Sequence, residues 1–158
     1  MATNPFLGTY VPEKVSVILG DDEAYGWADG SMITVEPEAE QFNIKVGTKG
    51  ETTRTRIHNH NYRITMRFQQ TSPFISTLEQ YVTVDSVFNI PDAVPLTIKD
   101  PSSYEGFFSG VAWVQALPSR DWGDDAGVRE YVFYAVSGVT NDDDVDIALN
   151  FAANLGIV

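Results

Sequence analysis

The sequence predicts a mainly β domain of the α+β class: an antiparallel β-sandwich or barrel with one flanking α-helix. Two observations favour this class. Apolar and polar residues alternate with a period of two along most of the chain. One segment, which follows Ser72, has helical spacing instead. The 158 residues contain no internal repeat or linker, so we expect a single domain over 1–158, with an N-terminal arm over 1–13 and a C-terminal tail over 141–158.

The first strands are predicted from apolar residues at alternate positions. These rows begin at Val15, Phe42 and Tyr62. Residues that favour turns lie between them, including Gly47-Thr48-Lys49-Gly50 and the proline-containing stretch Glu36 to Glu40. We therefore expect antiparallel hairpins that follow one another along the chain.

The helix is predicted to begin at Ser72, because a serine side chain can cap the first turn and a proline follows it. Phe74, Leu78 and Val82 then recur at helical spacing and are the expected core residues of the helix. The β-branched run Val82 to Val84 predicts an end after about three turns. The apolar stripe indicates that the helix lies across the sheet.

Three later strands are predicted over Leu96 to Lys99, Phe107 to Leu117 and Val128 to Val139. The last of them is apolar on both faces, which favours burial on both sides. Either the helix or a neighbouring subunit would then cover its second face. Trp113 is predicted to lie in the core, and Trp122 to be exposed.

Charge is distributed unevenly. The chain carries 22 acidic and 10 basic residues, a formal net charge of −12, which argues against a protein that binds duplex nucleic acid by neutralising phosphates. The segment from Glu51 to Gln80 is the exception, with Arg54, Arg56, Arg63 and Arg67. A basic stripe on an acidic body indicates either contact between copies of the chain or a solvated strand face.

No segment predicts export or membrane insertion. The first twenty residues have no basic start and no apolar stretch of secretory length. The longest apolar run, Tyr131 to Val136, is far shorter than the roughly 20 residues needed to cross a bilayer. We expect a soluble protein.

No constellation of residues predicts catalysis, a metal or a cofactor. The chain has no cysteine, which excludes disulfides and thiolate sites. His58 and His60 would share one face of a strand, but no third ligand lies near them in sequence. Alternating aspartates from Asp142 resemble the start of a calcium loop, yet they lack its glycine and glutamate. We therefore expect no enzymatic activity and no cofactor.

The aromatic residues leave a second function open. Trp122 and nearby tyrosines would suit a monomeric β-sandwich that binds a carbohydrate or a peptide, because aromatic faces offer stacking area with polar edges. In a β domain, most aromatic side chains instead belong to the core or to an interface.

The order of these segments resembles the tail tube proteins of contractile-tailed bacteriophages, from about Val15 to about Val139. The resemblance lies in the combination of several short pieces, each weak by itself. These are Gly26-Trp27-Ala28-Asp29-Gly30-Ser31, the hairpin loop Val46 to Arg56, Phe68-Gln69-Gln70-Thr71-Ser72-Pro73 before the helix, and Ile98-Lys99-Asp100.

The resemblance implies a structural virion protein. Six copies would form a ring, and rings would stack into the rigid inner tail tube inside a contractile sheath, with strands of neighbouring subunits joined into a continuous barrel. The phage genome would pass through the lumen during ejection. The implied partners are further copies of the chain, the tail sheath protein, and baseplate and tail-end proteins, with the tape measure protein and DNA in the lumen without specific binding, and no membrane. The implied location is the virion tail, after assembly in the host cytoplasm.

Within this picture, two sets of residues are expected to make contacts between subunits. The hairpin loop and the residues after it would project from the body and meet the next ring, through Gly47, Lys49, Gly50, Glu51, Arg54, Arg56, His58 and His60. Other subunit contacts are expected from Tyr131, Phe133, Phe151 and Leu155. The acidic excess suits a negative bore that repels phosphates and lets DNA slide.

Overall fold

The computed structural model describes residues 5–88, 93–103 and 105–141. In chain order the elements are η1 (Pro12–Lys14), β1 (Ser16–Leu19), β2 (Asp22–Glu23), β3 (Ile33–Pro37), β4 (Phe42–Val46), β5 (Thr52–Arg56), β6 (Tyr62–Gln69), α1 (Phe74–Phe88), β7 (Val94–Asp100), β8 (Glu105–Ala116), β9 (Val128–Val136) and β10 (Val139–Asn141).

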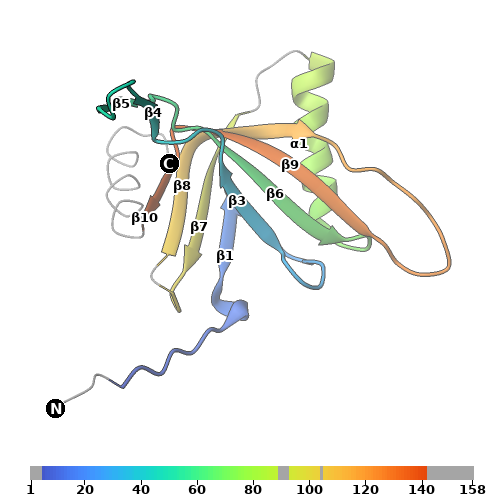
Figure 1. Cartoon of the computed structure of the whole chain (residues 1–158). Coiled ribbons are helices and arrows are strands. Elements are labelled where there is room, and N and C mark those ends of the chain that lie inside the picture. Colours follow the sequence, from blue (N-terminus) through green and yellow to red (C-terminus); the bar gives the residue numbers. More distant parts are fainter. Residues whose placement is uncertain (1–4, 89–92, 104, 142–158) are drawn as a thin grey trace.

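Eight strands form one antiparallel sheet in the order β2-β1-β7-β8-β9-β6-β3, and β10 pairs with β8. The strands β4 and β5 form a separate hairpin, which stands at one end of the sheet (Figure 1). The end strands β2 and β3 do not pair with each other, so the sheet is open within the described residues. The predicted class, mainly β with one helix, is confirmed. No helix among these residues has the length and apolar character needed to span a bilayer.

Neighbouring strands in the sheet are often distant in sequence. Ser16 of β1 lies opposite Lys99 of β7, and Tyr62 of β6 lies opposite Ala135 of β9. The prediction of hairpins in series is therefore wrong for these pairs, because alternation determines which face of a strand is buried but not which strand lies beside it. The strand β3 was not predicted, since it is short and ends in the proline that signalled a turn.

The core lies between α1 and the face of the sheet that the helix covers. Its largest fully buried side chains come from the helix and from five strands of the sheet: Val17, Leu19, Ile64, Met66, Phe68, Phe74, Leu78, Leu96, Phe107, Tyr131 and Phe133. Aromatic rings meet in its centre, where Phe68 lies 5.5 Å from Phe74 and 6.3 Å from Tyr131 between ring centroids. Such burial of large apolar side chains is the main source of stability in a domain of this size.

The helix is longer than predicted. It runs through the β-branched residues as far as Phe88, because packing on the sheet outweighs their small cost in helix propensity. Phe74 and Leu78 are 1% and 0% exposed, and Val82 is half-buried. The helix therefore rests on the sheet chiefly by its first two turns.

Ser72 does not act as the predicted helix cap. Its hydroxyl donates a hydrogen bond of 2.7 Å to the carbonyl oxygen of Tyr25 instead. Next to this bond, Gly26 has a φ of 78°, and a Cβ at that position would collide with the Ser72 side chain. The start of the helix is thus fixed to the loop before β3 by a close approach that requires glycine.

The strand β9 buries only one face completely. Tyr131 and Phe133 are 0% and 1% exposed in the chain's own core, so the prediction that they contact another subunit is wrong. The two-residue period points them toward the same layer as α1. Trp113, predicted as core, is half-buried on the opposite face, where its ring lies 5.2 Å from that of Tyr134.

Candidate assembly surfaces

The β4–β5 hairpin is a highly exposed element. Every residue of β5 is exposed. The turn closes through a 2.7 Å hydrogen bond from the amide of Gly47 to the carbonyl oxygen of Glu51, and Gly50 adopts a φ of 90°. That conformation favours glycine, which explains why the glycines of this segment correctly predicted a turn.

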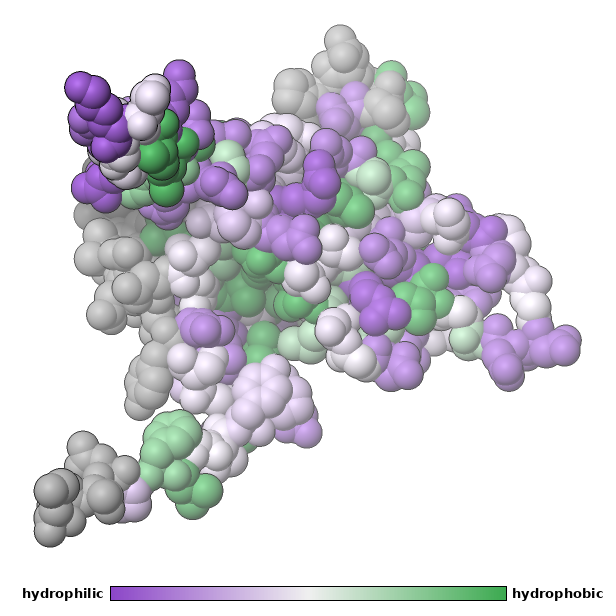
Figure 2. Space-filling model, in the orientation of Figure 1, coloured by the Kyte–Doolittle hydropathy of each residue, from purple (hydrophilic) through white to green (hydrophobic). Residues whose placement is uncertain are grey.

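The two faces of the hairpin differ in character. Pairing places Ile44 opposite Arg54 and Phe42 opposite Arg56, so apolar residues and arginines share one face. The two guanidinium carbons lie 4.5 and 5.0 Å from the centre of the Phe42 ring, within cation–π range. Ile44 and Val46 are 62% and 67% exposed. This hairpin face is left uncovered by the described residues, as the green and purple surface in Figure 2 shows.

Side-chain hydrogen bonds fix the base of the hairpin to the sheet. The Tyr134 hydroxyl donates to Glu38 at 2.6 Å, Asn59 donates to the same carboxylate at 3.2 Å, and Asn61 donates to the Tyr134 oxygen at 2.8 Å. The bond from Tyr134 lowers the pKa of Glu38. The hairpin is therefore held in a defined position.

His58 and His60 lie in the segment that joins the hairpin to β6, and both are exposed. The backbone carbonyl of His60 accepts a 2.9 Å hydrogen bond from the amide of Gly138. Among the residues that the structure describes, no three His, Asp or Glu side chains lie close enough together to hold a metal ion. The aspartate run from Asp142, and Phe151 and Leu155, lie outside those residues.

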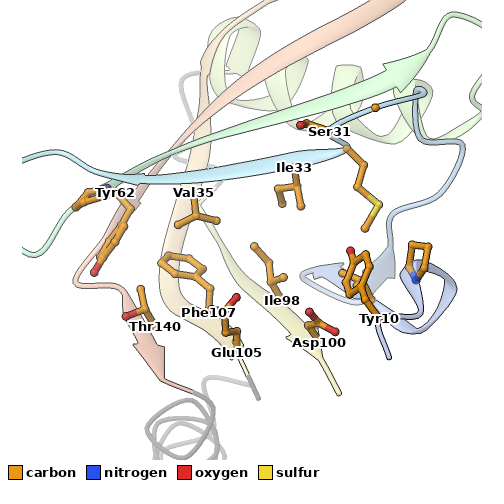
Figure 3. A pocket seen from close by; sticks show the side chains of 16 residues that line it. Tyr10, Ser31, Ile33, Val35, Tyr62, Ile98, Asp100, Glu105, Phe107 and Thr140 are labelled. Carbon is orange, nitrogen blue, oxygen red and sulfur yellow. The ribbon is translucent and has the colours of Figure 1, made fainter. Parts of the chain in front are cut away.

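A second candidate surface is a trough of about 940 Å³ at the end of the sheet away from α1. Figure 3 shows Ile33 and Val35 of β3 on one wall, facing Ile98 and Phe107 of β7 and β8 on the other. The rest of the lining combines Asp100, Glu105 and several hydroxyl-bearing residues with further apolar ones, among them Val15 and Met32. No sequence pattern predicts this trough, because its two walls are far apart in the chain.

Around the helix, the sheet carries a small polar cluster. The buried Tyr131 hydroxyl donates a hydrogen bond of 2.7 Å to Glu79 of α1, and Arg120 forms an ion pair with the same carboxylate. Burial and the neighbouring carboxylate raise the pKa of Tyr131 to about 12. The cluster joins α1, β9 and the loop before β9.

Trp122 is 76% exposed, which confirms that prediction. The guanidinium carbon of Arg129 lies 5.8 Å from its ring centre, and Arg129 is itself only 3% exposed. This arginine donates a 2.9 Å hydrogen bond to the carbonyl oxygen of Asp121. The loop before β9 thus exposes the indole of Trp122, which packs on the buried Arg129.

Together these features define a class of domain: an open antiparallel sheet with one covering helix and with apolar surfaces that the described residues leave uncovered. No model of a known protein family matches the chain. A curated relative, Structural protein ORF10 of Pseudomonas phage KPP10, is 24% identical over 139 residues, which cover 78% of this chain and 76% of the relative.

Three solved structures have the same fold. The anti-feeding prophage cap, a tube terminating cap, matches with a TM-score of 0.58 and 14% identity over 89% of this chain and 94% of its own. The sheath/tube terminator of the extracellular contractile injection system PVC matches with a TM-score of 0.60 and 16% identity over 89% and 99%. The sheath-tube complex of that system matches with a TM-score of 0.59 and 15% identity over 84% and 91%. The resemblance to tail tube proteins is thereby confirmed at the level of the fold.

Proposed function

We propose that this chain is a structural subunit of the inner tube of a contractile phage tail, with no catalytic role. Six copies form a ring, rings stack into a tube inside a sheath, and the genome passes through the lumen. The observation that carries this proposal is the β4–β5 hairpin, whose apolar and arginine face is left uncovered by the residues that the structure describes.

A two-stranded hairpin alone is marginally stable in water. Here its exposed face combines Ile44 and Val46 with Arg54 and Arg56, a composition suited to an apolar surface with an acidic rim. A body with a net charge of −12 offers such acidic rims. The hairpin of one ring is therefore proposed to pack on the body of a subunit in the next ring, where Gly47, Lys49 and Glu51 of the turn also make contact.

The open sheet supports the same proposal. Within the described residues β3 pairs on one side only, with β6, so its other edge has free backbone groups that invite pairing. Ring closure would bring neighbouring sheets together and leave no free edges in a continuous barrel.

The acidic excess of the chain is proposed to make the lumen of the tube negatively charged. A negative bore repels phosphates, so DNA and the tape measure protein pass without specific binding. Assembled tubes should therefore not pellet with labelled duplex at moderate salt. Co-pelleting that weakens steeply as salt rises would instead place arginines in the bore.

A second candidate is a ring that ends a tube. Two of the three structural relatives are described as a tube terminating cap and a sheath/tube terminator. A terminating ring would present one surface for stacking and would not grow into tubes alone. In that role its partners are the last ring of a tube and the sheath around it.

Negative-stain microscopy with light scattering of the purified chain tests these alternatives. A tube subunit gives rings with six copies that stack into tubes of variable length. A terminator gives rings that stay single or pair and that block growth when added to tubes. Monomers at every concentration would overturn both proposals and favour the binding module, whose exposed Trp122 could then be tested for quenching by sugars or peptides.

A further inference from the structure

The N-terminal arm carries two large apolar side chains that none of the described residues covers. Phe6 and Leu7 are 94% and 91% exposed. The arm is fixed only from Val11 onward, where its amide donates a 3.2 Å hydrogen bond to Ser102 and η1 begins. Figure 1 shows the segment before this point directed away from the sheet.

The trough between β3 and the β7–β8 pair is a cavity that could receive these apolar side chains. Its walls carry the half-buried Ile33 and Val35 opposite Ile98 and Phe107, which are 8% and 2% exposed (Figure 3). Its volume of about 940 Å³ is at the upper end of ligand-pocket sizes. The arm and the trough are both rich in apolar side chains and belong to one chain. We infer that the arm of one subunit inserts Phe6 into the trough of a second copy, with Leu7 against its rim. This inference rests on the proposed ring assembly.

Geometry favours a second copy over the arm's own chain. Tyr10 belongs both to the arm and to the rim of its own trough. Phe6 lies four residues further out on an extended segment, which places it up to about 13 Å beyond that rim. The same extended length allows Phe6 to contact a neighbouring subunit. Repetition of one such head-to-tail contact gives a ring when the rotation between neighbouring copies closes, as the proposed assembly requires.

Charge favours the arm over the other apolar segment of the chain. Asp100 and Glu105 are the charged residues that line the trough. The arm from Pro5 to Val11 has no charged side chain, whereas the C-terminal tail enters after four aspartates between 142 and 146. An acidic segment at an acidic rim is repelled, while a neutral apolar arm is not.

Cysteine crosslinking provides the test, because the natural chain has no cysteine. Phe6→Cys chains are mixed with Val35→Cys chains under assembly conditions, oxidised mildly and run on a non-reducing gel. We expect disulfide-linked heterodimers, and a ladder up to ring size from the double variant. Trp122→Cys, also highly exposed, replaces Phe6→Cys in the matched control and should give no link to Val35→Cys.

Each other result overturns the inference. A link within one chain of the double variant means that the arm folds back on its own trough. A link from Phe151→Cys but not from Phe6→Cys assigns the trough to the C-terminal tail. If rings form but neither link is found, the proposed function stands and the insertion of the arm is wrong. The trough would then hold a small ligand or solvent. Monomers without any link remove the ring proposal and this inference together.

A second readout measures the contribution of the arm to assembly. Phe6→Asp with Leu7→Asp should shift rings to monomers at concentrations where the natural chain is fully assembled. Thr9→Asp adds charge to the same exposed arm without removing an apolar side chain, so it should leave rings largely intact. If Thr9→Asp loses as many rings as the Phe6→Asp, Leu7→Asp variant, the added charge and not the lost apolar side chains prevents assembly. That result would overturn the insertion of Phe6.

Discussion

The layer beneath α1 and the β4–β5 hairpin are both rich in apolar side chains, but they differ in how those side chains are covered. Under the helix, Phe74, Leu78 and Tyr131 are at most 1% exposed. On the hairpin, Ile44 and Val46 are more than 60% exposed. The first region is covered by the chain itself, whereas the described residues leave the second uncovered and we propose that another subunit covers it. Substitutions should therefore affect folding in one region and assembly in the other.

Leu78→Ala tests the covered region and has the largest expected effect on folding. The truncation leaves a cavity in a fully buried site, so we expect the free energy of unfolding to fall by about 2–5 kcal/mol. Urea denaturation followed by circular dichroism measures this loss. Val87→Ala, at a 68% exposed position of the same helix, is the control and should change stability by less than about 0.5 kcal/mol. Equal effects would remove Leu78 from the core.

Gly26→Ala tests how closely the start of the helix is fixed to the sheet. The backbone φ of 78° and the collision with Ser72 should together cost about 1–3 kcal/mol of unfolding free energy. Gly123→Ala is the matched control, because a Cβ there has nothing within 4 Å and the φ is not in the strained range. Thermal unfolding of the two variants compares them. Similar thermal unfolding midpoints for the two variants would contradict the close approach of Gly26 to Ser72.

Alkaline pH should weaken the covered region through Tyr131. Its folded pKa of about 12 lies above the ordinary value of 10.0, so the stability it contributes is present below about pH 10 and is lost as the pH rises through about 12. Urea unfolding near pH 9 and near pH 11 measures the loss. In Tyr131→Phe this contribution is absent, so its stability deficit relative to the natural chain should narrow as the pH rises. A constant deficit would mean that the hydroxyl does not titrate in this range.

The smallest effect on folding is expected from Arg54→Glu with Arg56→Glu in the hairpin. Both residues are exposed, so the unfolding free energy of the monomer should change by less than about 0.5 kcal/mol. Charge reversal at the proposed contact should nevertheless abolish tube growth in negative-stain images. Thr53→Glu with Thr55→Glu, on the opposite face of β5, provides the control. Tubes of normal length in the arginine variant would place the contact elsewhere.

Local patterns predicted most of the elements. Alternation located the strands that begin at Phe42 and Tyr62, and helical spacing located α1, because these signals depend only on neighbouring residues. The end of the helix and the role of Ser72 were wrong, since both depend on contacts with the sheet and with Tyr25. Tertiary packing overrides a weak local preference at such positions.

The candidate surfaces were less predictable. The arginines and the glycine turn marked the hairpin in advance, because a turn is a local feature. Tyr131 and Phe133 were misassigned to an interface, since alternation cannot tell which face of β9 meets the helix. The trough between β3 and β7 requires knowledge of the strand order, which no short pattern contains.

The strand order also has a consequence for the timing of synthesis. The first strand of the sheet, β1, pairs with β7, and β6 pairs with β9, which is among the last strands of the described chain. Distant pairs must close long loops before any contact stabilises them, which slows folding. During translation, β1 and β6 therefore leave the ribosome well before these partners exist. A nascent chain therefore has no finished sheet, and the proposed tube assembly would draw only on completed subunits.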